Sequence, residues 1–144
     1  MKMAIASDHG GWKLKEKIKE MLNQTGGIEI IDLGTNNEDS VDYPDYGVGV
    51  ATKVSNNEVD SGILVCGTGI GMTTVASKFP NVRVALAYDK FSAEMAKRHN
   101  NANLLTLGAG LIGLNQAKLI VKTWLATEFA GGTVFSSGIC RYHR

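Results

Sequence analysis

A glycine-rich segment that follows a cysteine is the part of this sequence best suited to chemistry. Cys66 ends the apolar run 61–66, and the segment 67–71 reads Gly-Thr-Gly-Ile-Gly. Glycines let a backbone approach a ligand closely, and free N–H groups at a helix start attract an anion. A thiol at such a position has an increased thiolate population and can act as a base or nucleophile. The alternatives are a tight turn without a ligand and, for Cys66, a small buried hydrophobe.

The glycine segment departs from three common phosphate-binding patterns. A dinucleotide fingerprint requires GxGxxG, but the spacing here is GxGxG, and the nearest later acid, Asp89, is expected to cap a helix. A P-loop requires a lysine that this segment lacks. A cysteine phosphatase would place an arginine where this chain has Met72. The sequence therefore indicates an anion-binding turn of another kind, in which Thr68 either donates to a substrate oxygen or stabilises the turn.

Polar side chains at two other places could join this segment. Asp8 and His9 follow the apolar run 2–7, although Asp8 could serve only as a helix cap. His99 ends a predicted helix, where it could perform acid–base chemistry or interact with the helix dipole. No metal site is expected, because the histidines lack the spacing of metal ligands.

The apolar pattern predicts the elements that position these side chains. Strands are predicted at 2–7, 29–33, 61–66, 82–87 and 104–107. Helices are predicted at about 14–25, 46–54, 72–78, 90–99 and 115–128, with the second starting after Pro44 because a proline disfavours helix at the preceding residue. This alternation predicts an open α/β fold, a parallel sheet between two helical layers. Ligands of such folds bind beyond the carboxyl ends of the strands, where the polar and glycine segments fall.

Length and composition predict one domain, 1–144, with an atypical tail from about residue 131. The net charge of +1 argues against a nucleic-acid partner, and no apolar run is long enough to span a membrane. Two cysteines without paired spacing and no recognisable signal segment predict a reduced, cytoplasmic protein. Residues 1–72 contain 6 basic and 11 acidic side chains, whereas residues 73–144 contain 9 and 3. This asymmetry could complement a second copy or an anionic ligand, or be only a solvated surface.

Four segments resemble the ribose-5-phosphate isomerase B family and its relatives, the galactose-6-phosphate isomerase subunits and the tetrulose-phosphate isomerases. They are 7–11 (SDHGG), 41–46 (VDYPDY), 65–72 (VCGTGIGM) and 99–103 (HNNAN), and the similarity runs from residue 2 to about 132. The resemblance implies a Rossmann-like three-layer sandwich with a five-stranded parallel sheet. It also implies a homodimer or dimer of dimers with active sites between subunits, and no metal or organic cofactor.

The same resemblance implies an aldose–ketose isomerase that acts on a small sugar phosphate through a cis-enediolate, with ribose 5-phosphate and ribulose 5-phosphate as the leading pair. Cys66 matches the base, and Thr68 with the loop N–H groups matches the groups that stabilise the enediolate. His99 of the partner subunit matches the acid that assists ring opening, and Asp8 matches a residue that binds a hydroxyl and helps opening. His9 matches a phosphate ligand. The positions that match substrate contacts are Asp8, His9, Tyr43, Gly67, Thr68, Gly69, Ile70, Gly71 and Asn100.

The sequence departs from the family at the phosphate clamp. The family usually has arginines at the positions of Gly110 and Thr133 and near Ser137. Glycine, threonine and serine side chains cannot make the bidentate contact of an arginine with a phosphate. The substrate could be another sugar, such as galactose 6-phosphate, a tetrose phosphate or a sugar without phosphate, or a different partner chain could supply the arginines. A non-catalytic sugar-phosphate-binding module is the alternative outside the enzymes, although such a binder needs no base. The clamp could also have been rebuilt by the tail residues Arg141, His143 and Arg144.

Overall fold

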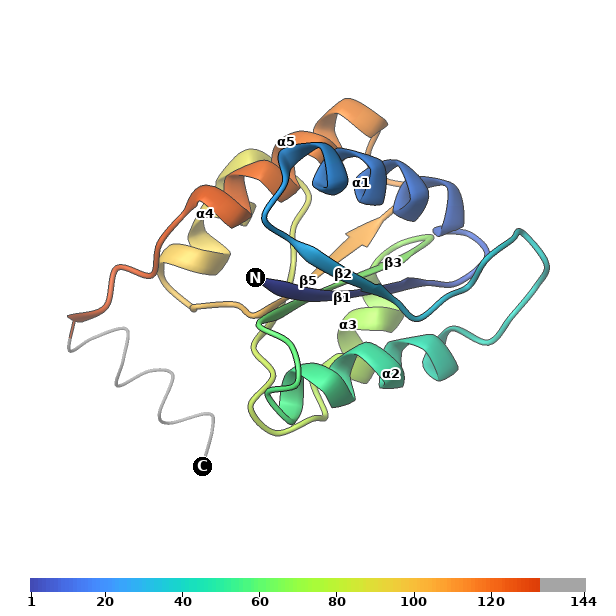
Figure 1. The fold of residues 1–144 in the computed structure, drawn as a ribbon, viewed down its shortest axis with the longest axis horizontal. Coiled ribbons are helices and arrows are strands. Elements are labelled where there is room, and N and C mark those ends of the chain that lie inside the picture. Colours follow the sequence, from blue (N-terminus) through green and yellow to red (C-terminus); the bar gives the residue numbers. More distant parts are fainter. Residues whose placement is uncertain (133–144) are drawn as a thin grey trace.

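A five-stranded parallel sheet lies between two layers of helices in the computed structural model, which describes residues 1–132 (Figure 1). The strand order is β2-β1-β3-β5-β4. The α/β class, the parallel sheet and the three layers predicted from the sequence are confirmed. The elements are β1 Lys2–Ser7, α1 Trp12–Thr25, β2 Glu29–Asp32, α2 Tyr43–Ser55, β3 Ser61–Cys66, α3 Ile70–Ala76, β4 Val84–Leu86, α4 Lys90–Arg98, β5 Leu104–Gly108 and α5 Leu114–Ala126.

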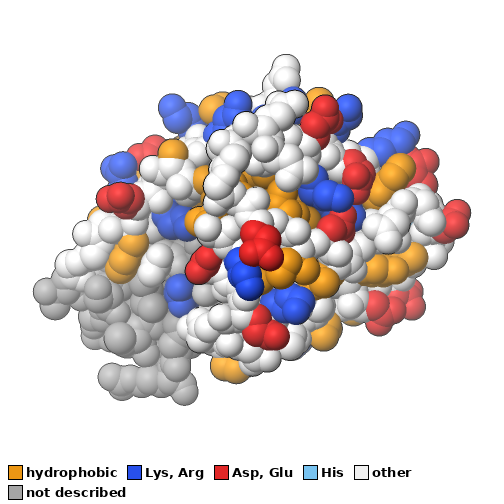
Figure 2. All heavy atoms as spheres, viewed as in Figure 1, with side chains coloured by type: hydrophobic (Ala, Val, Ile, Leu, Met, Phe, Trp, Pro, Cys, Tyr) orange, Lys and Arg blue, Asp and Glu red, His pale blue; other side chains and the backbone are white. Residues whose placement is uncertain are grey.

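Apolar side chains from both faces of the sheet form two cores. Helices α1, α4 and α5 cover one face, where Trp124 is fully buried, and α2 and α3 cover the other, around Met72. Every residue of β3 is buried, as its continuous apolar run predicts for a central parallel strand. None of the helices within residues 1–132 is long and apolar enough to cross a membrane. Basic and acidic side chains are interspersed on the face shown in Figure 2.

The predicted boundary of α2 was wrong. The helix begins at Tyr43 and not at about residue 46, because Pro44 occupies its first turn. The first turn of a helix needs no donor from that position, and the fixed φ of proline suits it. Asp42, in the extended conformation, precedes the helix. Strand β4 is shorter than predicted, and the other boundaries differ by at most about two residues.

The strand order changes direction between β1 and β3. From β1 the chain moves to β2 on one side, and β3 pairs with β1 on the other, in a register that places Ser7 opposite Val65. The backbone N–H of Asp8 donates to the Val65 carbonyl at 3.2 Å. The loops that follow β1 and β3 therefore start side by side, at the type of crevice where open α/β sheets bind ligands.

A partly buried ion cluster of Lys15, Lys19 and Asp32 joins α1 to β2. Lys15 Nζ donates to the two carboxylate oxygens of Asp32 at 2.8 and 3.0 Å, and Lys19 Nζ donates to the same carboxylate at 2.6 Å. Partial burial alone would raise the pKa of Asp32, but hydrogen bonds from the two lysines and from a backbone N–H outweigh it and hold the pKa below its ordinary value.

We expect Asp32→Asn to destabilise the protein most above about pH 5 and progressively less as the pH falls below about 4. The folded carboxyl takes up its proton at a lower pH than the unfolded one. Its contribution is therefore present above the unfolded pKa and is lost as the pH falls through the folded pKa. Urea unfolding of both proteins from about pH 7 to pH 2.5 measures the difference. Asp39→Asn, at an exposed position, is the control, and a loss independent of pH would contradict the expectation.

Candidate active site

The Cys66 thiol lies at the end of β3 with a backbone donor directed at its sulfur. The N–H of Gly69 donates to Sγ at 3.1 Å, and Cys66 is only 4% exposed. The sulfur therefore lies against a backbone donor at the edge of the sheet where ligands of such folds bind. The geometry makes Cys66 a candidate base.

Gly69 can hold this donor in place only because it has no side chain. Its φ of +77° is left-handed, and a Cβ atom there would lie 2.5 Å from Leu86 Cδ1 and 3.1 Å from the carbonyl carbon of Leu107. Next to it, Thr68 is exposed, and its Oγ1 accepts the Ile70 N–H at 3.2 Å. Since Oγ1 is the acceptor in that contact, the hydroxyl hydrogen can be donated to a substrate oxygen.

Two threonines that the sequence analysis did not single out, one in α3 and one in β5, hold the glycine loop in place. Thr73 Oγ1 donates to the Gly69 carbonyl at 2.8 Å, and it lies 2.6 Å from Oγ1 of the fully buried Thr106. Because the Thr73 hydroxyl donates to Gly69, Thr106 is left as the donor in the short contact between the two hydroxyls, although its hydroxyl can also donate to the Ala85 carbonyl at 3.4 Å. This chain of hydroxyl contacts joins the middle of β5 to the residue whose N–H contacts the Cys66 sulfur.

Asp8 reaches the same edge of the sheet from the end of β1. Its Oδ1 accepts the N–H of Gly11 at 2.9 Å. Gly11 itself is the N-cap of α1 and no side chain caps that helix, so the helix-cap alternative for Asp8 was wrong. The half-buried carboxylate lies beside the glycine loop. A Cβ atom at Gly10 would lie 3.4 Å from Asp8 Oδ1 and 3.7 Å from the Gly67 nitrogen. The loops after β1 and β3 therefore contact each other.

His9 is held by a backbone donor of the loop between β2 and α2. The Val41 N–H donates to His9 Nδ1 at 3.1 Å. A ring nitrogen that accepts carries no hydrogen, so the neutral ring has its proton on Nε2. The exposed side chain can therefore donate from Nε2 to an anionic oxygen.

Tyr43 packs against the far end of the glycine segment. A Cβ atom at Gly71 would lie 2.8 Å from Cε2 and 2.9 Å from Cζ of the Tyr43 ring. The sequence analysis treated Gly71 as part of an anion-binding backbone. In the structure, this glycine gives the Tyr43 ring room to reach the loop.

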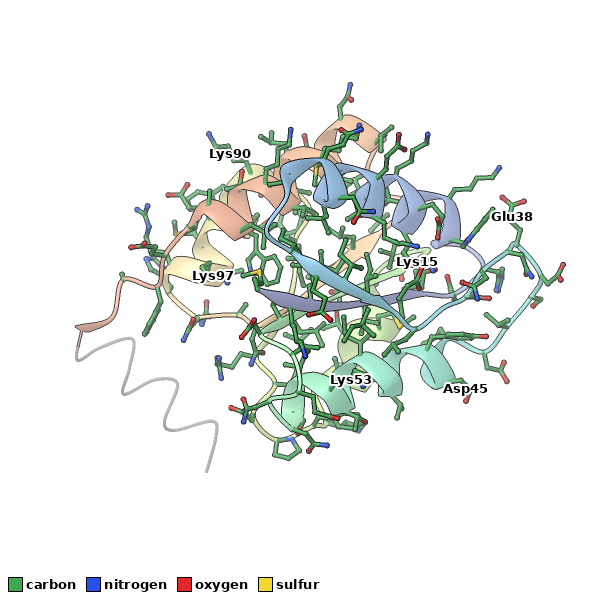
Figure 3. All side chains as sticks on the ribbon, in the orientation of Figure 1. Lys15, Glu38, Asp45, Lys53, Lys90 and Lys97 are labelled. Carbon is green, nitrogen blue, oxygen red and sulfur yellow. The ribbon has the colours of Figure 1, made fainter. Side chains whose placement is uncertain are left out.

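His99 and Asn100 are not brought to Cys66 within one chain. Helix α4 ends at Arg98 and leads into the start of β5, whereas Cys66 lies at the end of the neighbouring strand β3. Figure 3 shows Lys97 at the opposite end of the molecule from Glu38 and Asp45, which flank the site loops. Five residues of β5 separate the two edges, roughly 16 Å. Asn100 instead borders a cavity of about 690 Å³.

The structure places the unusual Gly110 beside the glycine loop. Its N–H donates to the Gly67 carbonyl at 2.8 Å, and a Cβ atom there would lie 3.0 Å from that oxygen. A side chain at this position would therefore start next to the site. The absence of an arginine here thus changes the immediate surroundings of the glycine loop. The other departures, Thr133 and Ser137, and the tail residues Arg141, His143 and Arg144 lie outside the described residues. In residues 1–132, no group of three or more His, Cys, Asp or Glu side chains could hold a metal ion.

Comparison with solved structures identifies this type of α/β sandwich. A ribose 5-phosphate isomerase of Thermotoga maritima is 46% identical, superposes with a TM-score of 0.94, and is matched over 99% of this chain and 97% of that one. Ribose-5-phosphate isomerase B of Mycoplasma genitalium, solved with bound ribulose-5-phosphate, is 37% identical, with a TM-score of 0.94 and coverage of 99% and 94%. The fold is thus that of the ribose 5-phosphate isomerase structures.

The sequence comparisons give the family. The model of the ribose/galactose isomerase family matches residues 3–136. Ribose-5-phosphate isomerase B of Escherichia coli is 41% identical over 131 residues, which are 91% of this chain and 87% of the relative. A Bacillus subtilis protein, whose name gives the class sugar phosphate isomerase without specifying the sugar, is 52% identical over 92% of this chain and 89% of its own. The chain belongs to the ribose/galactose isomerase family.

We expect Thr73→Val to lower kcat for sugar-phosphate isomerisation by about tenfold and to change KM less than about twofold. The substitution keeps the shape of the side chain but removes the hydroxyl donor to Gly69. The Gly69 carbonyl then keeps only the Thr73 backbone N–H at 3.0 Å, so the N–H at the sulfur is held less firmly. Steady-state kinetics measure both constants.

Thr74→Val is the matched control. Thr74 is exposed, and its hydroxyl makes the same kind of contact one residue along the helix, to the Ile70 carbonyl at 3.0 Å. Equal losses in the two variants would show that the chain through Thr106 has no particular role.

Proposed function

We propose that this isomerase interconverts ribose 5-phosphate and ribulose 5-phosphate through a cis-enediolate. The observation that carries the proposal is the Cys66 thiol, which receives the Gly69 N–H at 3.1 Å beside the open glycine loop. The relatives from Escherichia coli and Thermotoga maritima, named for this reaction, support the choice of substrate.

In the proposed reaction, the Cys66 thiolate removes the proton from C2 of the open-chain aldose. The electron pair of the C–H bond forms the C1–C2 double bond, and the carbonyl oxygen on C1 takes up the negative charge. The thiol then returns the proton to C1, and the hydroxyl proton on O2 moves to O1, which gives the ketose. Thr68 and the N–H groups of segment 67–71 other than those of Gly69 and Ile70, which donate within the loop, stabilise the enediolate. Donors fixed where charge develops lower the barrier.

The remaining groups bind and open the sugar. Asp8 accepts a sugar hydroxyl and assists ring opening, and His9 donates from Nε2 to the phosphate. Tyr43 completes the wall of the site at Gly71. Ile70 lines the site at the start of α3, where its N–H donates to Thr68 Oγ1 and orients that hydroxyl.

The proposed site is completed by a second copy of the chain, as a homodimer or dimer of dimers. His99 of the partner subunit supplies the acid for ring opening, and the partner's Asn100 contacts the substrate. The separation of His99 from Cys66 within one chain supports this arrangement. Four apolar side chains that are 59–69% exposed around the carboxyl edge also support it, because such surfaces mark contacts with other proteins. They are Ile70, Tyr88, Phe91 and Leu111.

The choice of sugar phosphate depends on the residues at the positions of the family's phosphate-binding arginines. Gly110 lies beside the loop without the arginine of the family, and one relative, at 32% identity, is a D-erythrulose-4-phosphate isomerase. A tetrose phosphate or galactose 6-phosphate is therefore the second candidate. A panel of sugar phosphates in D₂O, followed by NMR, separates the candidates, because deuterium enters C2 of the true substrate only. If no sugar phosphate exchanges with the wild-type protein, the isomerase assignment is wrong and a binding module is favoured.

We expect Cys66→Ala to reduce isomerisation and deuterium exchange at C2 by at least about 100-fold, because the base is removed. Cys140→Ala is the control and is expected to keep wild-type turnover. Retained exchange in Cys66→Ala would refute the assignment of the base.

We expect Cys66→Ala and His99→Ala chains to restore each other. Each variant alone is expected to be inactive on the cyclic sugar, but a mixed dimer contains one site with both wild-type residues. Tandem purification with two different tags should give a mixed dimer with about half of the wild-type activity. An inactive mixed dimer would show that His99 does not serve the site of the other chain.

A further inference from the structure

We propose that Lys15 is a positioning residue of the active site: it fixes the loop between β2 and α2, and that loop sets the orientation and tautomer of the His9 ring. The inference rests on the proposed function only in taking His9 as a substrate contact. The Lys15 ammonium group hydrogen-bonds to Asp32 and Thr35, neither of which is assigned to the reaction. Figure 3 shows it between α1 and the sheet.

All three hydrogens of the Lys15 ammonium group have acceptors. Nζ donates to Asp32 Oδ1 at 2.8 Å, to Asp32 Oδ2 at 3.0 Å and to the Thr35 carbonyl at 2.6 Å. The residue is fully buried, and a buried ammonium group is tolerated only where it is paired and hydrogen-bonded. The two acceptor residues therefore have to stay where the lysine holds them, and Thr35 is the first part of the loop to be fixed.

From Thr35 the constraint passes to the end of β1. The Thr35 N–H donates to the Ser7 carbonyl at 2.8 Å, and the Ser7 N–H donates to the Gly34 carbonyl at 2.6 Å. The Gly34 N–H in turn donates to Asp32 Oδ1 at 2.9 Å. The start of the loop is thus joined both to the lysine and to the residue before Asp8.

At its other end, the loop sets the orientation and the tautomer of the His9 ring. The Val41 N–H reaches Nδ1 at 3.1 Å only while the loop follows its present path. If the loop moves, Nδ1 loses its donor, and the ring is free to rotate and to carry its proton on either nitrogen. The Nε2–H that would bind an anionic substrate oxygen is then present in only part of the molecules.

A second lysine contacts the same loop and provides a matched control. Lys13 Nζ lies 2.9 Å from Glu38 Oε1, but both side chains are mostly exposed, and exposed ion pairs contribute little. The loop therefore has one buried and one exposed attachment to the same helix. Only the buried one is expected to control His9.

The experiment compares Lys15→Met with Lys13→Met by NMR of protein labelled with ¹⁵N-histidine, with His9→Gln used to assign the ring signals. We expect the wild-type protein and Lys13→Met to show His9 with hydrogen on Nε2 only, and Lys15→Met to show a mixture of the two tautomers. For ribose 5-phosphate, we expect KM to rise about tenfold in Lys15→Met with kcat changed less than about twofold, because a binding contact is lost.

Lys15→Met is expected to fold, since Asp32 keeps its contact with Lys19 at 2.6 Å. If circular dichroism shows it unfolded, Lys15→Gln undergoes the same measurements. Its amide ends one bond short of the ammonium group and cannot serve Asp32 and Thr35 together, so a smaller effect in the same direction is expected. A folded variant with a single Nε2–H tautomer and unchanged KM would overturn the proposal, as would equal effects from Lys13→Met. A wild-type protein without isomerase activity would refute the proposed function, while the tautomer measurement would still decide the role of Lys15.

Discussion

The backbones of the loops at the carboxyl edge of the sheet meet at distances that leave no room for a Cβ atom. At Gly11 such an atom would lie 2.6 Å from the Val65 carbonyl carbon, and at Gly108 it would lie 2.6 Å from the Thr68 carbonyl oxygen. The loops after β1 and β5 can therefore approach the backbone at the end of β3 without side chains between them. The N–H at the sulfur, the position of Asp8 and the place of Gly110 all depend on this close approach.

The close approach has two polar supports, one on each face of the sheet. On the side of α3, the Thr106–Thr73 hydroxyl chain ends at the Gly69 carbonyl. On the side of α1, the Lys15–Asp32 cluster ends at the loop that reaches His9. In each case a buried polar group makes its shortest hydrogen bonds only when a site loop keeps its position, which favours one arrangement of the loops.

The sequence was sufficient to predict the sheet and the location of Cys66, because apolar runs that end in glycine are strong signals of buried parallel strands and close turns. It was insufficient for α2, where Pro44 belongs to the first turn of the helix, a position that tolerates proline. Lys15 was missed although a signal existed: it lies on the same helical stripe as Ile18 and Leu22, where a lysine needs a buried partner. The hydroxyl chain could not be predicted, since the side chains that meet come from residues 33 positions apart.

The separation of His99 from Cys66 has a consequence for how such an enzyme can change. Under the proposed two-chain site, the acid and the base are held apart within each chain by the length of β5, five residues. The length of β5 then affects catalysis as well as packing. An insertion in the strand that the core could accommodate would still move the acid of one chain away from the base of the other. The subunit interface and the strand would have to change together, because the sheet helps to set the distance between the acid and the base.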